Sequence, residues 1–100
     1  MLDQDLKEQL KGVFAQLDNS IECVYTPSLH ADQAGLLDLL NDVASTSSKI
    51  KVRANQQVAA DVAPQFCLEK NGQTTGISFK GIPNGHEFTS FIVALLNVDG

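Results

Sequence analysis

The sequence has no tryptophan, one tyrosine, three prolines and two cysteines. No apolar run approaches the roughly 20 residues that a membrane-spanning helix needs. The first residues, Met1 to Asp5, contain neither a basic segment nor an apolar one, so we predict no secretory signal. Seven basic residues against twelve acidic ones leave a net charge of −5, which argues against duplex nucleic acid as a partner. We therefore expect a cytoplasmic protein.

A chain of 100 residues corresponds to one domain. Its 43% apolar and 19% charged residues are typical of a soluble globular protein. A chain of this size buries about 60–65% of its unfolded surface. That is enough for one small core without a disulfide or a structural metal.

The two cysteines, Cys23 and Cys67, belong to no C-x-x-C pair and have no zinc-finger spacing, so we predict no metal site. Both lie inside short apolar runs, which indicates buried small hydrophobic residues. The alternative is a redox pair between adjacent strands, which the sequence leaves open.

Apolar residues recur with helical spacing in three segments. Turn residues and alternating or β-branched runs separate these segments. We predict helices over about 2–17, 31–44 and 84–98, and strands over 21–25, 49–53, 65–70 and 75–80. Residues 54–63 have no clear period and are expected to form a loop with at most one helical turn.

Three local signals refine these expectations. Ser28 is a candidate N-cap for the second helix. Asn84, with Glu87 three residues later, resembles a capping box at the start of the last helix. Asn71-Gly72 predicts the tight turn of a β-hairpin.

The expected order of elements indicates the fold class. Two strands separated by a helix predict a parallel pair, whereas the hairpin strands are antiparallel. The result is an α/β fold with a mixed four-stranded sheet flanked by helices, which we expect on both faces. This resembles the thioredoxin-like arrangement.

In thioredoxin-like folds a cis proline precedes the first hairpin strand, and it faces a C-x-x-C at the end of the first strand. Ala63-Pro64 stands at the first of these places, and Thr26-Pro27-Ser28-Leu29-His30 stands at the second. The second segment contains no cysteine, and a serine cannot replace a thiolate in dithiol chemistry at neutral pH. The resemblance therefore implies a vestigial active-site edge of Thr26, Pro27, Ala63 and Pro64.

Three segments resemble the F subunit of bacterial alkyl hydroperoxide reductase: Met1-Leu2-Asp3, Gly85-His86-Glu87-Phe88-Thr89-Ser90 and Ala94-Leu95-Leu96. The resemblance implies a cytoplasmic FAD- and NADH-dependent disulfide reductase that reduces a peroxiredoxin. Two thioredoxin-like folds in tandem form the N-terminal region of that flavoprotein, and only the second carries a C-x-x-C.

Residues 1–100 resemble the first of these two folds, which implies that more chain follows in the parent protein. The chain has no G-x-G-x-x-G motif, so we predict no cofactor in it. FAD and NADH are implied for the parent protein only.

Glu87 has two interpretations. At the third position of a helix its carboxylate would stabilise the helix start. The resemblance implies a second role, in which the glutamate lies against the neighbouring fold and acts as a general base for its dithiol. His86 is expected to make a local hydrogen bond, and His30 has no second ligand residue near it in the sequence, so neither suggests a metal site.

These observations lead to one main hypothesis. The chain is a non-catalytic module that buttresses the adjacent dithiol-bearing fold, in redox homeostasis and peroxide defence, and it is expected to self-associate when isolated. One alternative is a stand-alone thiol-disulfide redox protein that uses Cys23 and Cys67. Another is an adaptor that binds extended peptides along the Pro64 edge.

Overall fold

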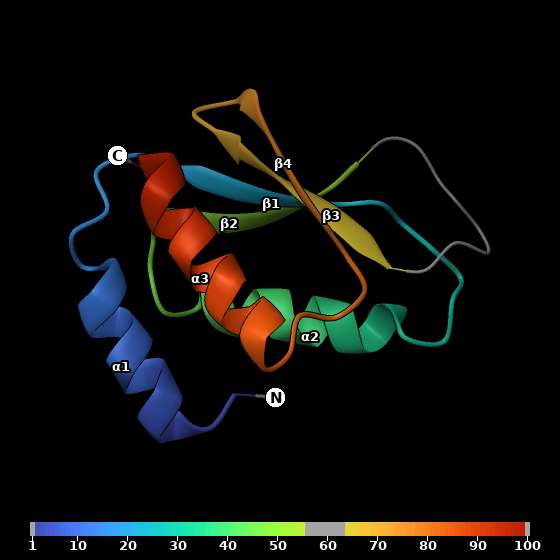
Figure 1. Ribbon diagram of the computed structural model, residues 1–100, viewed down its shortest axis with the longest axis horizontal. Coiled ribbons are helices and arrows are strands. Elements are labelled where there is room, and N and C mark those ends of the chain that lie inside the picture. Colours follow the sequence, from blue (N-terminus) through green and yellow to red (C-terminus); the bar gives the residue numbers. More distant parts are fainter. Residues whose placement is uncertain (1, 56–63, 100) are drawn as a thin grey trace.

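The computed structural model describes residues 2–55 and 64–99 of the chain. Helices cover one side of a twisted four-stranded sheet (Figure 1). The elements are α1 (Gln4–Phe14), β1 (Ile21–Tyr25), α2 (Gln33–Ala44), β2 (Ile50–Ala54), β3 (Gln65–Lys70), β4 (Gln73–Lys80) and α3 (His86–Asp99).

The sheet has the strand order β2-β1-β3-β4. β1 pairs with β2 in parallel, and β3 pairs with β1 and with β4 antiparallel. The predicted mixed sheet is therefore confirmed, and β2 lies at one edge of it. Asn71 and Gly72 have φ angles of 51° and 85°, which is the left-handed geometry of the predicted hairpin turn.

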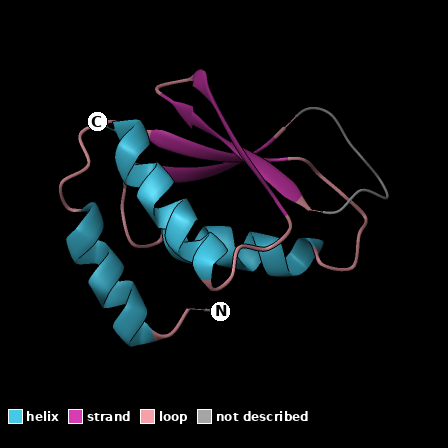
Figure 2. Cartoon of the chain, viewed as in Figure 1, coloured by secondary structure: helices cyan, strands magenta, loops and turns pink. Residues whose placement is uncertain are grey.

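The three described helices pack on one face of the sheet (Figure 2). Side chains of a strand alternate between faces, and the face of Ile21, Cys23 and Leu68 joins all three helices in a single apolar cluster. Val24 is also buried, yet it lies outside that cluster. Our expectation of helices on both faces is therefore wrong for residues 2–55 and 64–99. The opposite face carries the charged side chains of Glu22, Arg53 and Glu69 together with Val24 and Cys67.

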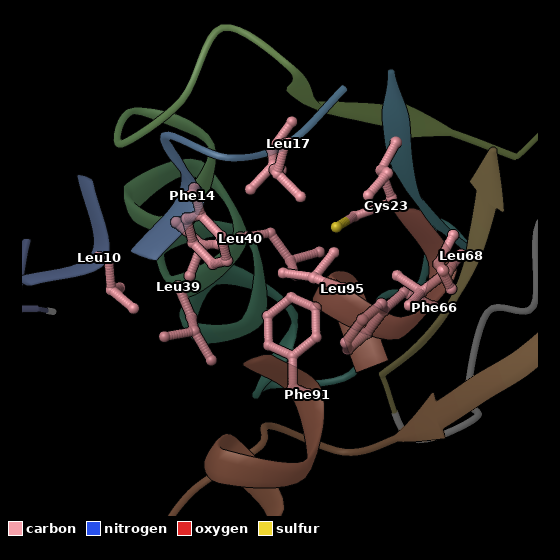
Figure 3. Close-up of a cluster of buried hydrophobic side chains, with 14 of the residues drawn as sticks. Leu10, Phe14, Leu17, Cys23, Leu39, Leu40, Phe66, Leu68, Phe91 and Leu95 are labelled. Atoms are coloured by element: carbon pink, nitrogen blue, oxygen red, sulfur yellow. The ribbon is translucent and has the colours of Figure 1, made fainter. Parts of the chain in front are cut away.

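Aromatic rings close the core between α3 and the hairpin. The ring centroid of Phe66 lies 5.1 Å from that of Phe91 and 5.3 Å from that of Phe79. Phe66 and Phe91 meet edge to face, which is a favourable geometry for aromatic pairs. Figure 3 shows Phe91 and Leu95 from α3 pointing at the same centre as Phe14 and Leu40.

Each of the three described helices begins two positions after its predicted start, and α1 ends at Phe14 and not at residue 17. Asp3 caps α1, since its Oδ1 accepts a hydrogen bond from the Leu6 N–H at 2.8 Å. α2 begins at Gln33 and not at residue 31, so Ser28 is too far away to cap it. The Ser28 hydroxyl instead accepts a hydrogen bond from the His30 N–H at 3.0 Å.

Most of the loop predicted over 54–63 lies outside the described residues, and Ala54 ends β2. β4 begins at Gln73, two positions before the predicted start. None of the described helices is both long and apolar enough to cross a membrane.

Candidate functional site

Three of the four residues of the predicted vestigial edge, Thr26, Pro27 and Pro64, lie near the end of β1. The Thr26 N–H donates a hydrogen bond to the Gln65 carbonyl at 3.0 Å, which extends the β1–β3 ladder by one step. Pro64 is buried, and its carbonyl accepts the Gly81 N–H at 2.5 Å. Thr26 and Pro64 therefore lie at the same end of the sheet, next to Pro27. Ala63 and its peptide bond to Pro64 lie outside the described residues.

Local hydrogen bonds hold the loop that stands where the thioredoxin-like fold has its dithiol. Besides the Ser28–His30 contact, the Asp32 N–H donates to Nδ1 of His30 at 3.1 Å. Leu29 at the tip is 81% exposed. The loop is thus ordered by its own polar groups, and it presents a hydroxyl and an apolar tip in place of two thiols.

The two cysteines lie on neighbouring strands but on opposite faces of the sheet. Cys23 is paired with Leu68 and Cys67 with Val24, so the register offsets the cysteines by one residue. Both are free thiols. Side chains that point away from each other cannot form a disulfide without backbone movement. This geometry does not support the alternative of a Cys23–Cys67 redox pair.

Burial separates the chemistry of the two thiols further. Cys23 is fully enclosed, and burial, with a smaller contribution from Cys67, raises its pKa to about 12. Burial and the nearby Glu69 carboxylate also raise the pKa of Cys67, and Arg53 partly offsets this rise. Both thiols are therefore protonated at neutral pH and poor nucleophiles.

Glu87 lies exposed in the first turn of α3. Its N–H donates to the Asn84 carbonyl at 2.9 Å, which starts the helix. Within residues 2–55 and 64–99 its carboxylate makes no hydrogen bond, so the side-chain contact of a capping box is not formed. His86 beside it is exposed as well. The carboxylate is thus open to a neighbouring surface.

An ionic cluster across three strands was not predicted from the sequence. Arg53 on β2 reaches Glu22 on β1 and Glu69 on β3, each at 2.8 Å. Glu22 and Glu69 are direct cross-strand partners, and two like charges so placed repel each other. Arg53 neutralises that repulsion. The alternation of side chains along each strand indicates which residues share a face. The strand order was also needed to show that these three residues are neighbours.

In the described part of the chain, no group of three or more His, Cys, Asp or Glu side chains is placed to hold a metal ion.

No protein-family model matches the chain. The whole chain aligns with the F subunits of two alkyl hydroperoxide reductases, at 38% identity over 100 residues for Pseudomonas aeruginosa and 36% over 102 residues for Staphylococcus epidermidis. A Bacillus subtilis protein named NADH dehydrogenase is 36% identical over 100 residues. Among solved structures, the NTD_N/C domain of alkylhydroperoxide reductase AhpF from Enterococcus faecalis has a TM-score of 0.87 and 26% identity.

This chain is similar over its whole length to AhpF, the F subunit of alkyl hydroperoxide reductase, and its structure matches part of the N-terminal domain of that protein. It spans 19% of the length of these AhpF relatives and 54% of the Enterococcus faecalis domain, while that domain covers 100% of the chain. The thioredoxin-like fold is thereby confirmed. The match to AhpF includes the loop and the edge described above, since it leaves no part of the chain uncovered.

Proposed function

We propose that this chain is a non-catalytic thioredoxin-like module of a flavoprotein similar to AhpF, and that it buttresses a neighbouring dithiol-bearing fold. One observation carries the proposal. The whole chain superposes on about half of the AhpF domain, but the loop from Thr26 to His30 has no cysteine, and Cys23 and Cys67 lie elsewhere on opposite faces. A fold that lacks reactive thiols can still hold a neighbouring fold in a fixed orientation, and so position that fold's dithiol for reaction.

The parent flavoprotein would use NADH and FAD to reduce a peroxiredoxin in the cytoplasm, as part of peroxide defence. This chain offers no element of its own for either cofactor, since it has no glycine-rich dinucleotide motif. Its direct partner would be the adjacent fold, and it would meet the peroxiredoxin only through that fold.

α3 is the surface we assign to this contact. Between Glu87 and Asp99 the sequence has no charged residue. Val93 on this helix is 47% exposed, and Phe88, Ile92 and Leu96 are only partly buried. A neutral, partly apolar helix face is suited to packing against a second domain. Glu87 at its first turn would then lie at the border of that contact.

In this arrangement Glu87 acts as a general base for the dithiol of the adjacent fold. The test is Glu87→Gln in a protein that contains both folds. We expect the thiol pKa of the adjacent fold, measured by pH-dependent alkylation, to fall, because a neighbouring negative charge that disfavours the thiolate is removed. We expect electron transfer to the peroxiredoxin to slow by about 100-fold, because the base that accepts the thiol proton is lost. The matched control is Asp38→Asn, which changes another exposed helical carboxylate away from α3. Unchanged thiol pKa and rate in Glu87→Gln would refute the base role.

The buttressing role has a separate test on the isolated chain. We expect concentration-dependent self-association in light scattering, because the α3 face is uncovered. Val93→Glu should abolish the association, while Leu29→Glu, at an apolar residue outside α3, should not. A monomer at all concentrations, or reduction of insulin by the isolated chain, would contradict the proposal.

A further inference from the structure

A pocket of about 270 Å³ opens at the end of the sheet where β1 stops and β3 begins. The register places Cys67 opposite both Val24 and Ser78, and Gln65 opposite Lys80. Paired residues share a face of the sheet, and so do residues two apart on one strand. Six side chains therefore reach the pocket from the face opposite to the helices: Val24, Thr26, Gln65, Cys67, Ser78 and Lys80.

The pocket has an apolar floor. Val24 is 3% exposed and Cys67 is half-buried beside it. A protonated thiol behaves as a small hydrophobic group with weak hydrogen bonding. The floor thus fits the branched or unbranched body of a small aliphatic group.

The rim of the pocket is polar and has one charge. Thr26, Gln65 and Ser78 contribute uncharged hydrogen-bonding groups, and Lys80 contributes an ammonium. Within residues 2–55 and 64–99 the side chains of Gln65, Ser78 and Lys80 make no hydrogen bond or ion pair.

The charge of Lys80 is the distinctive feature of this pocket in an acidic chain. No carboxylate from the described residues lines the pocket. The carboxylates of Glu22 and Glu69 on the same face are both bonded to Arg53. An anion in the pocket would therefore face the Lys80 ammonium, and no carboxylate of the described lining residues would repel it.

We propose that this pocket binds a short aliphatic carboxylate, with its apolar body on Val24 and Cys67 and its carboxylate on Lys80. Gln65 and Ser78 provide neutral donors to the same carboxylate. The chemistry is that of a free short-chain acid or of the C-terminal residue of a polypeptide. The inference is independent of the α3 contact, because the pocket lies on the other face of the sheet.

The experiment is an amide-correlation NMR titration of the full chain with isovalerate. We expect saturable shifts at the amides of Val24, Cys67 and Ser78, and none with the uncharged isovaleramide. Lys80→Met should weaken binding by about tenfold or more, because hydrogen bonds to charged groups are worth about 1.5–3 kcal/mol. Lys70→Met, at the far end of β3, is the matched control and should bind as the unmodified chain does.

Further arms distinguish the source of the carboxylate. Tighter binding of N-acetylvaline than of isovalerate would support a polypeptide C-terminus, and the reverse order would support a free acid. Ser78→Phe, at an exposed strand position, should fill the pocket and abolish binding of both probes. Absence of saturable shifts, or equal affinity of the Lys80→Met and Lys70→Met variants, would overturn the proposal.

Discussion

At the scale of single residues, burial decides what each thiol contributes. The Cys23 sulfur points into the apolar cluster among Leu17, Leu40 and Leu95 (Figure 3). There a protonated thiol packs as a small hydrophobic side chain, and no polar partner is required. The raised pKa of Cys23 gives stability that is fully present below the ordinary value of 9.0 and is lost as the pH rises toward about 12. Cys67 lies on the other face and is only half-buried, so its side chain contributes less to stability.

Cys23→Ser should destabilise the protein by about 1–3 kcal/mol, because it buries a hydroxyl without a hydrogen-bond partner in the apolar cluster. Urea unfolding measures the change. Cys67→Ser is the matched control and should change the free energy of unfolding by about 0.5 kcal/mol or less. In the native protein a thiol reagent should modify Cys67 first and Cys23 only after unfolding. Rapid modification of Cys23 would show that the cluster does not enclose it.

At the scale of elements, backbone geometry explains which predictions succeeded. The Asn71-Gly72 turn was predicted correctly because only a few residue types accept positive φ at two successive positions. The α2 start was predicted wrongly, because Ser28 found a local partner in the loop and the helix began at Gln33. Several polar residues in 26–32 could have capped a helix, and sequence alone did not distinguish them.

Gly72→Ala tests the turn. Gly72 has a φ of 85°, and a Cβ there would meet no atom within 4 Å, so the cost is conformational. We expect a loss of about 1–2 kcal/mol in the free energy of unfolding. Gly12→Ala is the matched control, since Gly12 lies within α1 and a Cβ there also meets nothing within 4 Å. In a helix this change should stabilise by about 0.5–1 kcal/mol. If both substitutions changed the free energy of unfolding in the same direction, the assigned turn geometry would be contradicted.

At the scale of the whole molecule, the Asp99 carboxylate at the end of α3 hydrogen-bonds to the loop between α1 and β1. Oδ1 of Asp99 accepts hydrogen bonds from the N–H groups of Asn19 at 2.8 Å and Asp18 at 2.9 Å. The Asn19 side-chain amide donates to the same carboxylate at 3.2 Å. The hydrogen bond from the Asn19 N–H is the main cause that lowers the pKa of Asp99 below its usual 3.8.

This contact predicts an acid-dependent loss of stability. A lowered pKa gives stability that is present above pH 3.8 and is lost as the pH falls through the lowered value. Asp99→Ala should therefore be less stable than the unmodified chain at pH 7, and the difference should shrink below pH 3.8. Thermal unfolding at a series of pH values measures this difference. Asp38→Ala serves as the control, and a difference between Asp99→Ala and the unmodified chain that is independent of pH would contradict the assignment.

The order of the elements, the mixed sheet, the hairpin and the absence of a dithiol in residues 26–30 could all be predicted from the amino-acid sequence. These features follow from residue spacing, turn chemistry and residue identity, which act over a few neighbouring positions. Three features required the folded chain: the described helices share one face, Cys23 and Cys67 point apart, and Arg53 bonds to both Glu22 and Glu69. Each of these depends on strand order and register, because a shift of one residue moves a side chain to the other face of the sheet. The pocket beside Lys80 depends on the same register, since residues from three separate strands form it.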